Sequence, residues 1–364
     1  MLLKGAKILD GNFKFSYKDL SIVGGNIQDV YLPGECDDCG DDIVDLTGYT
    51  ILPGLIDVHT HGAFGIDVMN GDLNELSRHM AKNGVTCFLP TTLTQDVALL
   101  KKVVSSSTET DGAKILGFHL EGPYLSKLRC GAQNPEFIRS AVEDDFEDCP
   151  QVRMITIAPE SVGAYDFIKK YADKLVISLG HTDCSYDMAV RAFSSGAKCL
   201  THMFNAMPPL FHRSPGPIGA ALTQDAYVQL IADGKHVHPA TVLMAYRSFG
   251  SSRMVLISDS ISATGALDGD YEFGGLNITV NNGVARTKDG NLAGSTSTLW
   301  DCVRSASYMG IPFEEAHKMA SLTPARLMGL SRKGVIANDK DADLFVVDSE
   351  FNIVRTMVDG QFVY

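Results

Sequence analysis

Short, uninterrupted apolar runs recur along the middle of the chain at intervals of about 22 to 37 residues. Strands that are buried on both faces are continuously apolar, whereas strands with one solvated face alternate, so this pattern is typical of an all-parallel sheet. Most of the runs are followed by a stretch compatible with a helix, which predicts a (β/α)8 barrel of the TIM type. The runs centre near Ile56, Phe88, Phe118, Ile155, Ile177, Leu200, Leu230 and Leu256.

The two ends of the chain follow a different pattern of short alternating strands separated by turns. We expect them to form one small β-sandwich domain, made of residues 1–52 and 332–364, beside a barrel of residues 53–331. A length of 364 residues is sufficient for both. The alternative, an open doubly wound sheet, would favour a glycine-rich dinucleotide turn after the first strand, and the sequence has none there.

The formal charge of −13 argues against nucleic acid and anionic membranes as partners, because both require clustered cations. No stretch reaches the roughly 20 apolar residues of a membrane span, and the N-terminus has no apolar signal region. We therefore expect a cytoplasmic protein. The cysteines are scattered, and we expect reduced thiols, with Cys36 and Cys39 in a surface loop rather than a zinc site.

Residue types that commonly bind metals stand at the ends of several predicted strands. The C-terminal ends of barrel strands converge on one mouth, so these side chains are expected to meet there. Alternation along the first strand places His59 and His61 on the same face. Imidazole and carboxylate without thiolate suit zinc, iron, manganese or cobalt, and the residues leave that choice open. The candidates are His59, His61, Glu121, His181, His202 and Asp259.

A metal in such a mouth polarises a carbonyl and lowers the pKa of bound water, and one further group must then move a proton. Asp259, alone at the end of the eighth strand, is the candidate; the alternative is that it only neutralises buried charge. In an acidic protein, an anionic substrate needs a local basic site. The loop 201–209 with the following Arg213, and the loop 233–236 with Lys235 and His236, offer backbone N–H groups and cations for a phosphate.

These motifs resemble the N-acetylglucosamine-6-phosphate deacetylases of the amidohydrolase superfamily. The matching segments run in the family's order: 53–62, 119–124, 180–182, 201–207, 232–236, 258–259 and 292–295. The resemblance implies a barrel with a split β-sandwich, metal-dependent hydrolysis of the acetamido group to glucosamine 6-phosphate and acetate, and a metal held by Glu121, His181 and His202. It also implies that Asp259 is the catalytic acid and base.

The resemblance further implies a set of substrate contacts: Ala132, Gln133, Asn205, Ala206, Arg213, His236 and the turn of Leu292, Ala293 and Gly294. In such enzymes the arginine that matches Arg213 comes from the neighbouring subunit, so a homodimer is expected.

The sequence departs from the family pattern at two places. His59 and His61 are both present, whereas relatives with a single metal often lack this pair, so one or two divalent metals per subunit are expected, the second bridged through Glu121. Many relatives carry histidine where Gln133 stands, and an amide can donate a hydrogen bond but cannot be protonated.

Three alternatives stay open at this point. Deacetylation of N-acetylgalactosamine 6-phosphate could use the same ligands. An amidase of the D-aminoacylase type would instead need a carboxylate-binding pocket. A non-catalytic barrel, like the collapsin-response relatives, would keep the fold without the chemistry.

Overall fold

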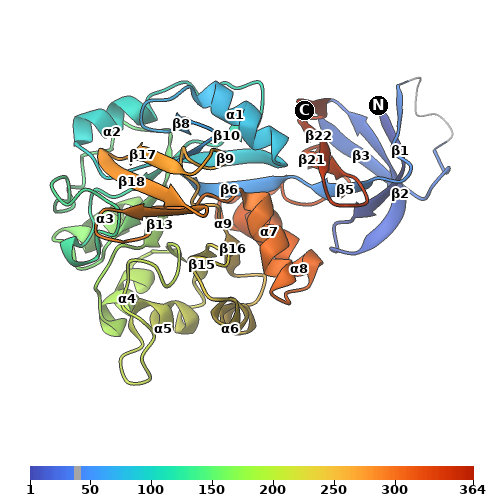
Figure 1. Cartoon of the computed structure of the whole chain (residues 1–364). Coiled ribbons are helices and arrows are strands. Elements are labelled where there is room, and N and C mark those ends of the chain that lie inside the picture. Colours follow the sequence, from blue (N-terminus) through green and yellow to red (C-terminus); the bar gives the residue numbers. More distant parts are fainter. Residues whose placement is uncertain (37–41) are drawn as a thin grey trace.

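The computed structural model describes residues 1–36 and 42–364 of the chain. Figure 1 shows a larger barrel region and, beside it, a smaller β region in which both termini lie. Cys39 falls outside the described residues. Cys36 is disulfide-bonded, so the expectation of a thiol is wrong at that position. No helix among the described residues is long and apolar enough to cross a membrane.

The smaller region is built from both ends of the chain, as predicted. Its central pairing joins the two ends directly, because β5 lies antiparallel to β21, with Ile51 opposite Val346. Both residues are fully buried in a separate apolar core. Among the described residues, the strand order is β20-β3-β2-β1-β5-β21-β22-β23, with β4 beside β1. The domain boundaries themselves stay a prediction.

The strands of this region have the following bounds: β1 Leu2–Leu9, β2 Phe15–Val23, β3 Asn26–Tyr31, β4 Ile43–Asp45, β5 Thr50–Pro53, β20 Lys340–Asp341, β21 Leu344–Val347, β22 Ile353–Val358 and β23 Gln361–Phe362.

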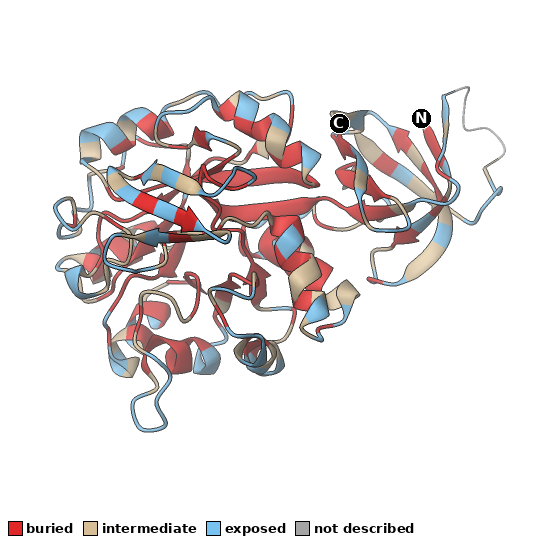
Figure 2. Cartoon of the chain, viewed as in Figure 1, coloured by how far each residue is buried: buried red, intermediate tan, exposed pale blue. Residues whose placement is uncertain are grey.

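The predicted parallel barrel is confirmed, and every apolar run forms one of its strands. The order within the described residues is β6-β9-β11-β12-β13-β14-β15-β16, with the short β10 (Lys114–Ile115) also on β9. The bounds are β6 Leu55–Thr60, β9 Val85–Thr92, β11 Phe118–Glu121, β12 Val152–Ile157, β13 Val176–Leu179, β14 Cys199–Leu200, β15 Tyr227–Leu230 and β16 Met254–Leu256. Figure 2 shows that β6 and β9 are buried along their length, as the uninterrupted apolar runs require.

Backbone hydrogen bonds close the barrel just beyond β16. The amide of Asp259 donates to the carbonyl of His59 at 2.9 Å, and the amide of His61 donates to the carbonyl of Ser260 at 2.8 Å. The seam of the barrel therefore runs through the predicted site.

Helices cover the outside of the barrel. Their apolar residues recur at helical spacing, as in α1, where Leu73, Leu76 and Met80 are buried, and side chains cap their ends, as Asp72 does for α1. The bounds are α1 Leu73–Lys82, α2 Val97–Val104, α3 Ala164–Tyr171, α4 Tyr186–Ser194, α5 Gly216–Thr223, α6 Pro239–Phe249, α7 Leu299–Tyr308, α8 Phe313–Ala320 and α9 Leu322–Leu327, with the short 3-10 helix η1 at Lys127–Arg129.

Two antiparallel elements were not part of the predicted pattern. A small hairpin, β7 (Gly62–Ala63) and β8 (Ile66–Asp67), follows β6. A three-stranded sheet, β17 (Gly269–Phe273), β18 (Leu276–Asn281) and β19 (Val284–Thr287), follows β16. Phe273 of this sheet lies edge-on against the ring of His61, with centroids 5.4 Å apart, so the sheet reaches the barrel mouth.

Candidate active site

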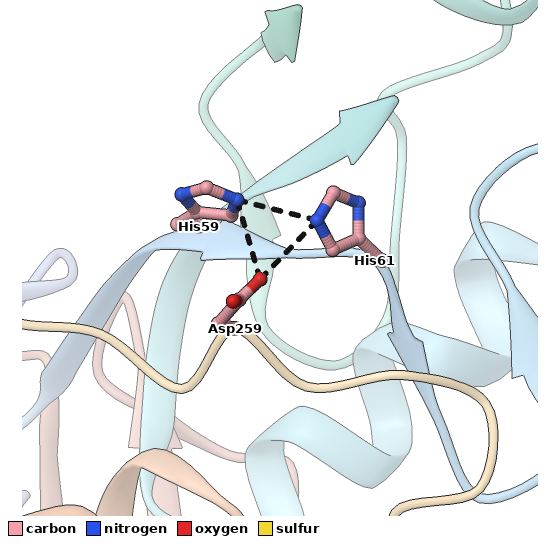
Figure 3. Close-up of side chains that lie close together, drawn as sticks. All are labelled: His59, His61 and Asp259. Carbon is pink, nitrogen blue, oxygen red and sulfur yellow. Dashed lines mark hydrogen bonds and ion pairs between the residues drawn. The ribbon is translucent and has the colours of Figure 1, made fainter. Parts of the chain in front are cut away.

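The five predicted metal ligands and Asp259, the predicted proton carrier, meet at the mouth of the barrel, and all six are buried. They form two groups, and within each group the ligand atoms lie within 4.8 Å of one another. One group is His59, His61 and Asp259, and the other is Glu121, His181 and His202. We call the six residues together the metal end. Figure 3 shows the first group, in which the imidazole of His59, on β6, and that of His61, one residue past its end, are turned toward Asp259. The Nε2 atoms of His59 and His61 are 3.2 Å apart, so the predicted alternation along β6 is correct.

Glu121 joins the two groups through its two carboxylate oxygens. Its Oε1 lies 3.2 Å from Nε2 of His181 and 3.0 Å from Nε2 of His202. Its Oε2 lies 3.3 Å from Nε2 of His61. One carboxylate therefore faces both groups, which is the arrangement that a ligand shared between two cations requires.

The histidine tautomers favour a cation at this place. Nδ1 of His61 faces the carbonyl of Thr91 at 3.0 Å, and Nδ1 of His181 faces the carbonyl of Arg129 at 3.0 Å. A carbonyl only accepts, so Nδ1 carries the hydrogen and Nε2 presents a lone pair. Lone pairs and carboxylate oxygens that converge without a hydrogen between them repel one another unless a cation lies among them. Carbonyl partners of this kind typically orient metal-binding histidines.

The charged groups of the metal end shift one another's pKa values. Burial alone raises the pKa of Asp259, but attraction to His59 and His61 outweighs it, so the pKa is lowered. Burial lowers the pKa of His61, but where a proton instead of a metal cation lies between its Nε2 and the carboxylates, hydrogen bonding to Asp259 and Glu121 reverses this and raises it. The carboxylates are therefore held as anions facing the imidazoles, and they supply the negative charge that binds a divalent cation.

Three residues of the metal end have a left-handed backbone. The φ angles are +45° at His181, +26° at His202 and +48° at Asp259. Each residue stands just past the end of its strand, where the chain turns sharply. For residues other than glycine this conformation costs of order 1–3 kcal/mol, and it persists where the side chain is needed.

Gln133 is placed differently from the predicted substrate contact. Its side chain is 3% exposed, and its Oε1 accepts a hydrogen bond from the amide of Thr94 at 2.7 Å. Its Nε2 donates to Oε2 of Glu121. The amide thus links the backbone after β9 to the carboxylate that joins the two groups. Gln133 also lines the pocket described next, so contact with substrate stays a prediction.

A pocket of about 430 Å³ opens in front of the metal end. It includes most of the predicted substrate contacts, namely Ala132, Gln133, Asn205, Ala206, His236, Leu292 and Gly294. Ala293 is fully buried and does not line it. The lining also contains residues that we did not predict: Leu128, Arg129, Cys130, Phe204, Phe273 and Asn291.

The part of the pocket away from the metal end is suited to an anion, and we call Asn205, Ala206 and His236, which line it, the anion end. Phe204 and Ala206 have φ angles of +81° and +51°, and such alternating turns direct successive N–H groups toward one point. Nδ1 of His236 is held by Asp233 at 2.8 Å. The anion end is therefore formed by loops that follow several different strands.

Two expected cations lie elsewhere in this chain. Nζ of Lys235 donates to the carbonyl of Gly283 at 2.6 Å, and Lys235 does not line the pocket. Arg213 is exposed in the loop between β14 and α5, and its Nη1 lies 2.9 Å from Nε2 of His212. The sequence signal for Arg129 was a basic residue in the loop after the third barrel strand, directly before the predicted Ala132 and Gln133.

Comparisons with known proteins agree with this geometry. Residues 50–363 match the amidohydrolase family. The chain is 39% identical to the N-acetylglucosamine-6-phosphate deacetylase of Vibrio furnissii, over 89% of this chain and 85% of the relative. It is 36% identical to the N-acetylgalactosamine-6-phosphate deacetylase of Escherichia coli O157:H7, over 85% of this chain and 87% of the relative. The structure of a mutant N-acetyl-D-glucosamine-6-phosphate deacetylase from Mycobacterium smegmatis, in complex with N-acetyl-D-glucosamine-6-phosphate, is 32% identical, with a TM-score of 0.90 and coverage of 100% of this chain and 99% of that chain.

Proposed function

The chain belongs to the N-acetylglucosamine-6-phosphate deacetylase family of amidohydrolases, and on this premise we propose that it hydrolyses the acetamido group of N-acetylglucosamine 6-phosphate to glucosamine 6-phosphate and acetate. The observation that carries the proposal is Glu121, whose carboxylate joins two histidine groups at the barrel mouth, 3.0 Å from His202 on one side and 3.3 Å from His61 on the other. A protein that used this fold only as a scaffold would have no need for these buried, strained ligands.

The donor set fits a divalent cation. Glu121, His181 and His202 would hold one cation, and His59, His61 and Asp259 would contribute to a second. Such a cation polarises the amide carbonyl and makes water more acidic. Zinc, iron, manganese and cobalt all suit these ligands.

Proton transfer is the part of the reaction that we assign to Asp259. Its carboxylate is anionic, 10% exposed and directed at the mouth, so it can take a proton from the attacking water. It then delivers that proton to the amine nitrogen as the C–N bond breaks, which yields acetate and the free amine. Phe273 packs against the ring of His61 at the same place.

Phosphate recognition is assigned to the anion end. Asn205 and Ala206 offer the turn that follows His202, and His236 is oriented by Asp233. Arg213 is exposed on its own subunit, which supports a role in the pocket of a neighbouring copy and hence a homodimer. We also propose a cytoplasmic location, because an amino sugar phosphate is an intracellular type of metabolite.

The test is acetate release by the metal-reconstituted protein from three compounds. We expect fast release from N-acetylglucosamine 6-phosphate and slow release from N-acetylglucosamine, which lacks the phosphate. The galacto epimer is the second candidate substrate, because a relative with 36% identity is named for it. Preference for the epimer would keep the mechanism and change the substrate. Release only from N-acetyl-D-amino acids would refute the phosphate assignment and favour the D-aminoacylase alternative.

A further inference from the structure

Arg129 is the single lysine or arginine among the described residues that line the pocket. It ends the short helix η1, and its side chain is 37% exposed. In a chain with a net charge of −13, a guanidinium at the mouth of the pocket strongly affects the local potential that an anionic substrate meets.

The guanidinium is held in a defined orientation. Its Nε donates to Oδ1 of Asp183 at 2.8 Å. Asp183 is fixed in turn, because its amide donates to Oε1 of Glu160 at 2.5 Å, while the hydroxyl of Thr182 donates to the other oxygen of Glu160 at 2.5 Å. Among the described residues, neither terminal nitrogen of Arg129 has a hydrogen-bond acceptor. Four N–H donors are therefore left for a ligand.

The same contacts place Arg129 beside the turn that is suited to phosphate. The amide of Thr182 donates to the carbonyl of Ala206 at 3.1 Å, which joins the loop of Asp183 to the loop of Asn205 and Ala206. A Cβ built on Gly131 would lie 3.7 Å from Cβ of Ala206, so the loop of Arg129 contacts that turn directly.

We infer that Arg129 is a substrate-binding residue that binds the phosphate group of the sugar phosphate from within the same subunit, oriented by Asp183. The inference rests on the proposed function. A planar guanidinium fixed at Nε presents its two terminal nitrogens to oxyanions, which is the geometry that phosphate oxygens accept. Arg129 also orients His181 through its backbone carbonyl, and a side-chain substitution leaves that carbonyl in place.

The experiment compares Arg129→Met with wild type and with Arg78→Met. Arg78 is a matched control, because its Nε also donates to an aspartate, Asp111, at 2.8 Å, and it lies on α1 outside the pocket. The measurements are kcat and KM for N-acetylglucosamine 6-phosphate, the Kd of the metal-loaded protein for glucosamine 6-phosphate, and metal content.

We expect Arg129→Met to raise KM and the Kd for glucosamine 6-phosphate by about 10- to 100-fold, which corresponds to the loss of a charge-assisted hydrogen bond. The kcat should be nearly unchanged, because the phosphate contact is equally strong in the bound substrate and in the transition state. Metal content should match wild type, and Arg78→Met should match it in every respect. Asp183→Asn, which keeps the guanidinium but releases it, should give a smaller loss of the same kind.

An unchanged Kd for glucosamine 6-phosphate in Arg129→Met would overturn the inference, as would loss of bound metal together with kcat. These outcomes differ from failure of the proposed function, in which wild type itself releases no acetate from the sugar phosphate and both conclusions fall.

Discussion

The metal end and the anion end of the pocket are built in opposite ways. The six residues of the metal end stand on or just past barrel strands, are buried, and lie within one subunit. The residues of the anion end are half-buried and belong to loops, and Arg213, the arginine expected there, is exposed. The strands hold the metal-binding residues in place, whereas the loops form the part of the pocket that a substrate would contact.

The largest effect on turnover should come from a substitution in the metal end. Asp259→Asn removes the carboxylate to which we assign proton transfer but keeps a side chain that tolerates a left-handed backbone. We expect a loss of about 10² to 10⁴ in kcat, with KM and the content of the cation held by Glu121, His181 and His202 little changed. Turnover is followed by acetate release, and metal content by elemental analysis. Near-normal turnover would show that Asp259 only balances buried charge.

A substitution of Gln133 tests how far metal binding depends on the hydrogen bond that Gln133 donates to Glu121. Gln133→Leu removes the donor to Glu121, and we expect metal affinity to fall by about 10- to 100-fold, as for other partners of metal ligands. The measurement is competition between the protein and a chelator, without substrate. Gln224→Leu, on the exposed end of α5, is the control. Normal metal affinity with a raised KM would instead assign Gln133 to direct substrate contact.

Arg213 tests whether the anion end is completed by a second subunit. We expect Arg213→Ala to lower kcat/KM by about 10-fold or more, since a charged hydrogen-bond donor is lost. Dimers mixed from Arg213→Ala and Asp259→Asn subunits should regain activity, because one of their two sites is then intact. If mixing restores nothing, Arg213 does not act across a subunit interface.

The smallest effect on turnover should come from His317, which lies outside both ends. Burial lowers its pKa to about 4, and its Nε2 lies 2.9 Å from the carbonyl of Pro53. An unfolded histidine has a pKa near 6.5, so between about pH 6.5 and 4 only the unfolded chain binds the proton, and stability falls as pH falls. At the low end of this window the loss is about 3 kcal/mol, and above pH 6.5 it vanishes.

The check is urea unfolding at several pH values for wild type and His317→Gln, with kcat as the control. The variant should show a weaker pH dependence and an unchanged kcat. Equal slopes would mean that His317 keeps an ordinary pKa in the folded protein.

The sequence predicted the metal end better than the anion end, for a physical reason. A strand has one direction and alternating faces, so the placement of His59 and His61 follows from their spacing. A loop carries no such periodicity, so nothing in the pattern indicated that Gln133 would turn to Glu121. The basic residue at position 129 was visible in the sequence, but the pattern did not show that its side chain lines the pocket. The β17–β19 sheet did have a readable signal, because its alternating residues are separated by Gly274-Gly275 and by Asn282-Gly283.

The left-handed backbones of His181, His202 and Asp259 have a consequence for laboratory evolution. A selection for heat resistance alone would favour glycine at each of these positions, because glycine has no Cβ atom and adopts a left-handed backbone without steric strain. The selected variants would be more stable barrels that had lost their metal ligands one by one. A screen for a more thermostable variant of this protein must therefore measure acetate release in every round.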